Sequence, residues 1–255
     1  MTGELLDVTG DGREDAVLRA TEALRAGQLA VLPTDTAYGV AADAFNTRGT
    51  ARIFGTRDQP RRTPLPVLVR SPKQLAGLTT VVPEAAERLV AAYWPGALTI
   101  VLFAEPNLRW DLGRNEGTVA VRMPLDDVAL AVVRAVGPVA MTAASRCGET
   151  APATAAAARE ALGEAVEVYL DDGPRPAAAA STIVDLTRRE PAVLRAGLLD
   201  ADEVLAVARG ELDPFAATMP PPDEDAVGPA STGASDVAAV PDEDGEDPLD
   251  DARPV

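Results

Sequence analysis

The chain has 255 residues and a formal net charge of −17 at pH 7, and 47% of its residues are apolar but only 4% are aromatic. It contains no histidine and a single cysteine, Cys147, which excludes an imidazole base, a histidine-ligated metal site and an intrachain disulfide. Lys73 is the single lysine, so phosphate binding and other cationic roles fall to arginine.

The sequence gives no sign of a membrane segment or of a secretory signal. No apolar run reaches the roughly 18 residues that span a bilayer. The first residues, MTGELLDVTGDG, have neither a basic start nor an apolar stretch. We therefore expect a protein without membrane contact in a reducing, cytoplasmic setting, which the single cysteine also favours.

Short apolar runs alternate along the chain with segments of helical periodicity. The expected helices are 13–25, 50–56, 84–93, 125–136, 154–162 and 200–209. The expected strands are 28–32, 65–69, 98–103, 119–123, 139–142, 166–170, 181–186 and 192–195. This alternation predicts an α/β or α+β open sheet, and periodicity alone leaves parallel and mixed sheets both open.

The composition changes at Asp213. Twelve acidic residues and one arginine lie from there to the end, so residues 1–212 carry a net charge of −6. The segment is rich in proline, glycine and serine and has few large apolar side chains, which is typical of disorder. We expect a folded domain over 1–212 and an acidic tail over 213–255. The tail is either a solubilising segment or an interaction segment that competes for an arginine-lined groove.

Polar side chains follow the first predicted strand in the stretch LAVLPTDTAYG, residues 29–39. Pro33 ends the strand because it has no N–H to donate to the sheet. Thr34, Asp35 and Thr36 then place hydroxyls and a carboxylate at the strand end, where α/β proteins commonly bind ligands.

Six further blocks complete a recognisable set. They are IFGTRDQPRRTPLPVLV from Ile53, YWPGALTIVL from Tyr93, VAVRMP from Val119, GPVAMTAAS from Gly137, STIVDLT from Ser181 and VLRAG from Val193. In this order and spacing, the set resembles the YrdC-like family of threonylcarbamoyl-AMP synthases over residues 12–210. The resemblance implies an α/β (α+β) fold with a twisted mixed open sheet, flanking helices and a concave ligand groove.

The resemblance also implies a reaction. Threonine and bicarbonate form a carbamate, which attacks the α-phosphate of ATP and yields threonylcarbamoyl-AMP and pyrophosphate for the modification of tRNA adenosine 37. ATP is then a substrate and Mg²⁺ its usual companion. RNA and the threonylcarbamoyl transferase machinery are the implied macromolecular partners.

Five residues match substrate-facing positions of the family: Thr34, Tyr38, Arg122, Thr142 and Ser181. An arginine flanked by buried residues needs an anion, and in the family Arg122 faces the threonine carboxylate. The alternative for Arg122 is a structural ion pair with the acids at 126 or 127. The alternative for Tyr38 is a half-buried core aromatic.

The nucleotide positions implied by the family are Arg57, Arg61, Thr63, Ser145 and Arg195. Two motifs depart from the family pattern at this end. Where the family usually shows lysine–glycine–arginine–proline, the chain reads RDQP over 57–60, so the local charge falls from +2 to zero. Where the family shows serine–alanine–asparagine, the chain reads AAS over 143–145.

Two readings remain besides the synthase: the first follows from these departures, and the second from the link of YrdC-like domains to double-stranded RNA that the resemblance implies. One is a catalytically impaired paralogue that binds nucleotide or amino acid without turnover. The other is a module for double-stranded RNA, which requires Arg52, Arg57, Arg61 and Arg62 to form one patch. No catalytic side chain and no metal ligand is assigned, and Cys147 lacks a histidine to serve as its base.

Overall fold

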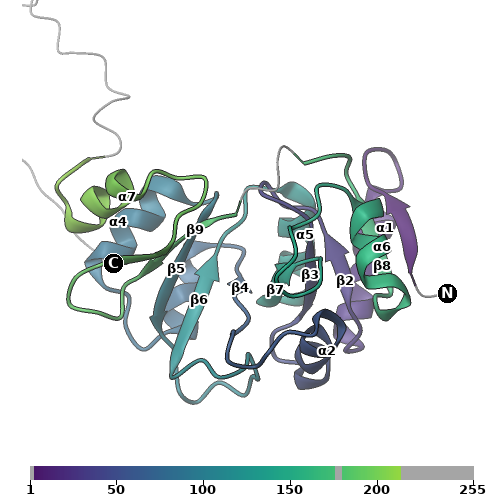
Figure 1. Cartoon of the computed structure of the whole chain (residues 1–255), viewed down its shortest axis with the longest axis horizontal. Coiled ribbons are helices and arrows are strands. Elements are labelled where there is room, and N and C mark those ends of the chain that lie inside the picture. The colour runs from purple at the N-terminus through teal and green to yellow at the C-terminus, as the bar shows by residue number, and fades with distance from the viewer. Residues whose placement is uncertain (1–2, 176–179, 214–255) are drawn as a thin grey trace, which may run out of the picture. The chain divides into compact units, whose positions relative to one another are not determined.

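A computed structural model of the chain describes residues 3–175 and 180–213 (Figure 1). These residues lie in the first of two units, Met1–Thr218 and Met219–Val255, into which the chain divides. Apart from Asp213, the predicted acidic tail lies outside the described residues. Within the described part of the chain, no helix is both long enough and apolar enough to cross a membrane.

The described residues form one ten-stranded mixed sheet with the strand order β1-β8-β2-β3-β7-β4-β6-β5-β9-β10. The strands are β1 (Glu4–Asp7), β2 (Ala30–Leu32), β3 (Gly39–Asp43), β4 (Val67–Leu68), β5 (Leu98–Phe103), β6 (Thr118–Arg122), β7 (Val139–Ala143), β8 (Val168–Asp171), β9 (Thr182–Asp185) and β10 (Ala192–Arg195). Parallel and antiparallel pairs alternate irregularly along the sheet. The mixed open sheet expected from the family resemblance is confirmed.

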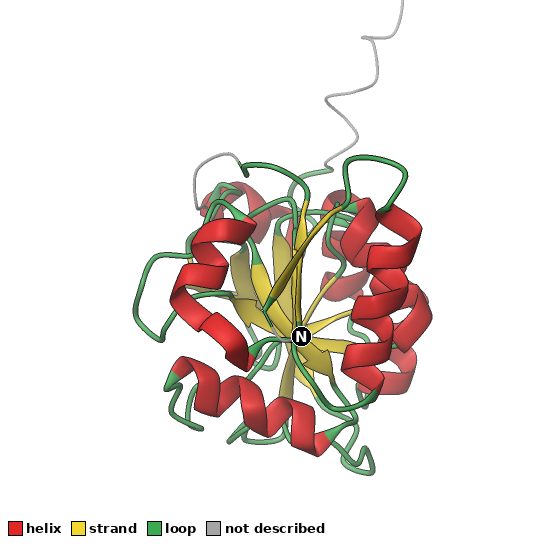
Figure 2. Ribbon diagram, turned by 90° about the vertical axis from the view of Figure 1, so that its right-hand side faces the viewer, coloured by secondary structure: helices red, strands yellow, loops and turns green. Residues whose placement is uncertain are grey.

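Helices flank the strands on both sides (Figure 2). The α-helices are α1 (Arg13–Arg25), α2 (Thr47–Arg57), α3 (Leu75–Leu78), α4 (Glu84–Tyr93), α5 (Asp127–Val136), α6 (Ala155–Leu162) and α7 (Ala201–Arg209), with 3₁₀ turns η1 (Pro72–Gln74) and η2 (Gly163–Ala165). α1 packs on α5, and α4 packs on α7. Side chains of Asn46, Asp126, Thr154 and Asp200 cap α2, α5, α6 and α7 by accepting a backbone N–H of the first turn.

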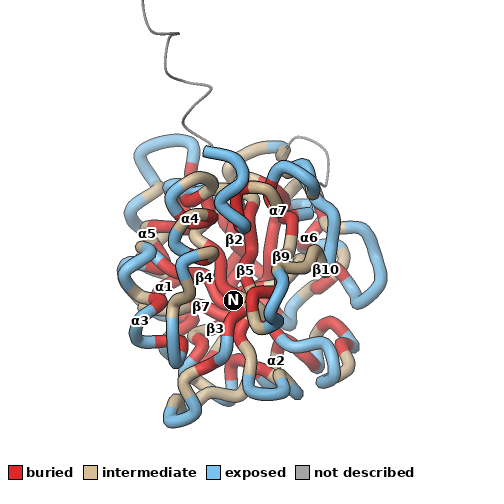
Figure 3. The backbone as a smooth tube through the Cα atoms, turned by 90° about the vertical axis from the view of Figure 1, so that its left-hand side faces the viewer, coloured by how far each residue is buried: buried red, intermediate tan, exposed pale blue. Residues whose placement is uncertain are grey.

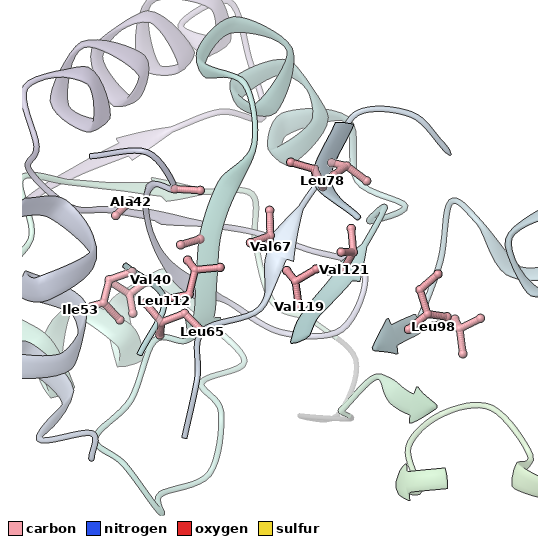
Figure 4. Close-up of a cluster of buried hydrophobic side chains, with 14 of the residues drawn as sticks. Val40, Ala42, Ile53, Leu65, Val67, Leu78, Leu98, Leu112, Val119 and Val121 are labelled. Carbon is pink, nitrogen blue, oxygen red and sulfur yellow. The ribbon is translucent and has the colours of Figure 1, made fainter. Parts of the chain in front are cut away.

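The core is built mainly from valine, leucine, isoleucine and alanine, as the low aromatic content requires. Buried residues follow the strands through the centre of the molecule, and exposed residues lie on the outer turns and helix faces (Figure 3). The larger hydrophobic cluster joins Ile53 of α2, Val40 of β3, Val67 of β4 and Val121 of β6 (Figure 4). A second cluster packs α1 and α5 against the opposite face. Both faces of the sheet are therefore covered.

Several predicted elements have the observed bounds, among them the helix 84–93 and the strands 98–103 and 192–195. The strand β3 was missed, because Gly39, Ala41 and Ala42 lack the β-branched side chains that mark a strand. α2 begins at Thr47, three residues before its predicted start, because Asn46 accepts the Gly49 N–H at 3.2 Å. β1 and α3 were also missed.

Candidate functional site

The polar stretch after β2 forms a tight connection to β3. Thr34 is 2% exposed, and its hydroxyl donates to the Ala37 carbonyl at 2.6 Å while accepting the N–H groups of Thr36 and Ala37 at 3.2 Å. β2 and β3 pair in antiparallel fashion directly on either side of this connection. The Thr34 hydroxyl thus stabilises the turn that holds Asp35 and Thr36 in place.

Arg122 ends β6, and its guanidinium is bound to this turn. Nη2 donates to both oxygens of Asp35 at 2.7 Å, and Nη1 donates to the Thr36 hydroxyl at 3.0 Å. Nε donates to the Gly96 carbonyl at 2.9 Å. Arg122 is only 7% exposed, so this is a buried, charge-assisted pair. Burial lowers the pKa of Arg122, the Asp35 carboxylate opposes that shift, and neighbouring Arg195 adds to it.

The expected alternative, an ion pair of Arg122 with Asp126 or Asp127, is wrong. Asp126 instead caps α5 and accepts a hydrogen bond from Arg175 at 3.0 Å. The cap requires Asp126 to face the first turn of its own helix, so its carboxylate is committed to α5. The carboxylate that pairs with Arg122 comes from the distant β2–β3 turn, which the linear sequence does not reveal.

Arg195 brings a second guanidinium close to Arg122. Its Nε donates to the Ser181 carbonyl and its Nη2 to the Ser181 hydroxyl, both at 3.0 Å. The Ser181 hydroxyl also lies 2.8 Å from that of Thr99 in β5. Thr99 pairs across the sheet with Ile183, and Ile183 pairs with Arg195. Among the described residues, Arg195 has no carboxylate partner.

Gly197 lets the chain after Arg195 pass tightly over β9. A Cβ at this position would lie 2.3 Å from the Ala180 carbonyl oxygen and 2.5 Å from the Thr182 nitrogen. The Thr182 hydroxyl accepts the N–H groups of Gly197 and Leu199 at 3.2 and 3.1 Å. This contact fixes the segment that carries Arg195 beside Ser181.

Tyr38 lies in the interior beside the same turn. Its ring is fully buried, and its hydroxyl donates to the Gly173 carbonyl at 2.6 Å and accepts the Asp172 N–H at 3.0 Å. Burial raises the pKa of Tyr38 to about 12. The Arg175 guanidinium lies over the ring, 5.7 Å from its centroid. Tyr38 therefore links the turn to the loop that follows β8.

Arg57 ends α2 and crosses to the loop after β7. Nη1 donates to the Ala143 and Ser145 carbonyls, and Nε donates to the Gln59 side-chain oxygen at 2.9 Å. Arg57 is 6% exposed, and burial lowers its pKa. Ser145 is also buried, and its hydroxyl faces the Glu149 carbonyl at 3.4 Å. The two altered motifs thus meet in one hydrogen-bonded group.

The remaining predicted nucleotide residues lie around this group. Arg61 pairs with Asp111, and its guanidinium lies 4.7 Å from the centroid of the Phe54 ring. Thr63 is exposed, and its carbonyl accepts the Gln59 amide at 2.8 Å. The proposed RNA patch loses two of its arginines, because Arg57 is buried and Arg61 is paired with an acid.

The β2–β3 turn and the loop after β7 adjoin each other where β3 begins and β7 ends, whereas the sheet register places Arg122 level with Val139, at the other end of β7. β3 pairs with β7 so that Gly39 faces Ala143 and Val40 faces Thr142, and the Ala144 N–H donates to the Tyr38 carbonyl at 3.0 Å. The turn that binds Arg122 and the loop that binds Arg57 therefore emerge side by side. We call the residues Asp35, Thr36, Thr99, Arg122, Ser181 and Arg195 the turn cluster, and Arg57, Gln59, Ala143 and Ser145 the loop cluster.

Thr99 and Gln59 are members of these clusters that the sequence analysis did not propose as site residues, whereas Asp35 and Thr36 were noted at the strand end without an assigned role. Asp35 is the only acid in its turn, a signal that was available. Gln59 was read only as a lost cation. Two cavities lie elsewhere. The first, of about 400 Å³, is lined by residues of α4, of the β9–β10 connection and of the end of α7, among them Arg88, Arg188 and Arg209. The second, of about 270 Å³, is lined by residues within 104–117. We favour the two clusters as the candidate site, because buried cations and perturbed pKa values gather there.

Comparison with known proteins decides the family. The Sua5/YciO/YrdC family model, described as telomere recombination, matches residues 22–197. A Mycobacterium tuberculosis protein provisionally named threonylcarbamoyl-AMP synthase is 44% identical over 195 residues, which cover 76% of this chain and 90% of that protein. This chain belongs to the Sua5/YciO/YrdC family. The resemblance inferred from its motifs is confirmed.

A solved family member shares the fold over most of the described residues. The crystal structure of Pyrococcus abyssi Sua5 complexed with L-threonine matches with a TM-score of 0.74 and 31% identity, covering 80% of this chain and 60% of that one. The P. abyssi threonylcarbamoyl-AMP synthase sequence is 34% identical over 182 residues, which are 71% of this chain and 54% of that protein. This chain therefore spans little more than half of the P. abyssi protein.

Proposed function

We propose that this protein is a threonylcarbamoyl-AMP synthase that acts in the modification of tRNA adenosine. The observation that carries the proposal is the convergence of Arg122, Arg195 and Ser181 beside the β2–β3 turn, which adjoins the loop that binds Arg57. Family membership and the names of the relatives support it. L-Threonine, bicarbonate and ATP are its proposed substrates.

The reaction has two steps that balance without an oxidant or a reductant. The threonine amine forms a C–N bond to bicarbonate carbon, and loss of water leaves a carbamate. A carbamate oxygen then forms a bond to the α-phosphorus of ATP, and the bond from that phosphorus to the bridging oxygen breaks. The electron pair leaves with pyrophosphate. The protein must therefore orient two anions and stabilise charge on the phosphate oxygens.

The turn cluster suits the amino acid. Two guanidinium groups and one carboxylate leave this cluster with a charge of +1, which complements the carboxylate of threonine. Because Asp35 already holds Nη2 of Arg122, the substrate carboxylate is assigned to the remaining donors of Arg122 and Arg195. The hydroxyls of Thr142 and Ser181 are the proposed polar neighbours of the substrate, and Thr34 and Tyr38 hold the turn behind it.

The loop cluster suits the phosphates. Arg57, Arg61, Thr63, Ser145 and Arg195 are the proposed nucleotide-binding residues. No group of three or more cysteine or acidic side chains within the described ranges is placed to hold a metal ion. Mg²⁺ would therefore enter on the ATP phosphates, the manner in which it commonly binds to enzymes of phosphoryl and nucleotidyl transfer.

Pyrophosphate release tests the proposal. The full chain is incubated with ATP and Mg²⁺, and threonine or bicarbonate is omitted in turn as a control. We expect release that requires both. Pyrophosphate release that is independent of threonine, or none from a protein that binds ATP, would contradict the synthase.

The second candidate is a family member that binds these ligands without turnover. It is favoured by Ala143, whose methyl group offers no hydrogen bond to a nucleotide, and by Gln59, which carries no charge. The variant with Arg57→Lys, Gln59→Arg, Ala143→Ser and Ser145→Asn restores the usual family residues. Activity that appears only in this variant would establish the second candidate. RNA enters as a further proposed partner, tested by whether RNA binding weakens as salt rises.

A further inference from the structure

Gln59 has both ends of its side chain fixed. Its amide oxygen accepts the Arg57 Nε–H at 2.9 Å, and its amide nitrogen donates to the Thr63 carbonyl at 2.8 Å. Because a guanidinium Nε can only donate, the amide must present its oxygen to Arg57 and its nitrogen to Thr63. The Gln59 backbone is also fixed, since its N–H donates to the Phe54 carbonyl at 2.9 Å beyond the left-handed Asp58.

Arg57 is a buried cation without a neutralising acid. Within the described residues it forms no ion pair: Asp58 pairs with Arg146, and Glu149, whose charge acts on Arg57 from outside ion-pair distance, accepts the Arg146 backbone N–H at 3.1 Å. A buried charge is costly unless an opposite charge accompanies it. Neutral oxygens satisfy the guanidinium hydrogens but leave its charge in place.

One part of Arg57 stays available. Nε is bound to Gln59, and Nη1 is bound to two main-chain carbonyls. Nη2 has no hydrogen-bond partner in the described part of the chain, and it is not fully buried, so it can still contact solvent or a ligand. The guanidinium is therefore held on one edge and presents a single amino group at the other.

We propose that Gln59 is a positioning residue that aims Arg57 at a phosphate-class anion while leaving the arginine charge unneutralised. Glutamate at this position would orient Arg57 but cancel its charge, and arginine would offer Nε no acceptor. Glutamine alone among these three provides an acceptor without a charge. The proposal rests on the proposed function, in which the phosphates of ATP lie beside the loop cluster.

The test is calorimetric titration of inorganic pyrophosphate into the full chain and into two variants. Gln59→Leu removes both hydrogen bonds, and we expect affinity to fall by about tenfold or more, the usual effect of losing a hydrogen bond to a charged group. Gln59→Glu keeps the acceptor and cancels the charge, so we expect a larger loss. Gln74→Glu is the matched control, because Gln74 also accepts a hydrogen bond through Oε1 but lies in η1, and it should stay within about twofold of the original affinity.

A double-mutant cycle separates positioning from a general structural effect. If Gln59 acts through Arg57, Gln59→Leu should change pyrophosphate affinity by less than about twofold in an Arg57→Lys background. An equal loss in both backgrounds, an unchanged affinity in Gln59→Glu, or no pyrophosphate binding by the original chain would each overturn the proposal. Thermal unfolding and threonine affinity report whether each variant is folded. If Gln59→Leu does not fold, the pyrophosphate affinity of Gln59→Glu alone tests the proposal.

The outcome is independent of turnover. Coupled loss of pyrophosphate affinity in a protein that makes no threonylcarbamoyl-AMP would support the role of Gln59 and contradict the synthase. Threonine-dependent turnover that is unaffected by Gln59 variants would support the synthase and overturn the role of Gln59.

Discussion

The substitution Asp35→Asn tests whether the buried pair with Arg122 holds the turn cluster together. The side chains of Arg122 and Asp35 are 9% and 16% exposed, and asparagine would leave the guanidinium buried without its counter-charge. Breaking a buried pair on one side commonly costs 3–5 kcal/mol. Asparagine still offers one acceptor oxygen, so we expect a loss of about 3 kcal/mol in the free energy of unfolding, or roughly 6–12 °C in Tm.

The matched control is Asp58→Asn, the same chemical change in an exposed pair. Asp58 and Arg146 have side chains that are 76% and 48% exposed, and surface pairs contribute less than about 1 kcal/mol. Urea unfolding followed by tryptophan fluorescence measures both variants. Equal losses in the two variants, or a loss below about 1 kcal/mol for Asp35→Asn, would refute the claim that burial makes the Arg122 pair important.

Three further predictions concern pH, packing and ligand affinity. Burial raises the pKa of all three tyrosines to about 12. The stability that each tyrosine contributes should therefore be complete below pH 10 and be lost as the pH rises from 10 to 12. Ultraviolet titration should show no tyrosine ionisation near pH 10 while the protein is folded. These tyrosines are Tyr38, Tyr93 and Tyr169. Gly39→Ala should destabilise the fold by about 1–3 kcal/mol in urea unfolding, because the new Cβ would lie 2.9 Å from the Thr142 carbonyl oxygen of the paired strand, and an unchanged midpoint would contradict that contact. Ser181→Ala removes the hydroxyl that Arg195 and Thr99 share, so threonine affinity measured by calorimetry should fall about tenfold, and an unchanged threonine affinity would contradict the assignment.

The sequence predicted the fold well where local patterns were strong. The helix 84–93 follows a proline at its start and has a clear apolar stripe, and β5 is a run of apolar residues interrupted only by the β-branched Thr99, so both were placed correctly. β3 was missed because glycine and alanine carry no strand signal, and its position depends on pairing with β2 and β7. Strand order is a property of long-range pairing, which periodicity does not encode.

The candidate site was predicted in part. The motifs located both arginines of the turn cluster, but the partner of Arg122 lies 87 positions away in Asp35, and no local pattern links the two. Similarly, Gln59 reads as a missing charge in the sequence, whereas the structure places its amide between Arg57 and Thr63. Roles that depend on which groups satisfy one another require the three-dimensional contacts.

The most direct test of the proposed synthase follows the carbon of bicarbonate. The full chain is incubated with ATP, Mg²⁺, threonine and ¹³C-bicarbonate, and the nucleotide products are analysed by mass spectrometry. We expect labelled threonylcarbamoyl-AMP in equal amount to the pyrophosphate released. A protein that binds ATP and threonine but forms no labelled adenylate would contradict the synthase and leave a family member that binds without turnover.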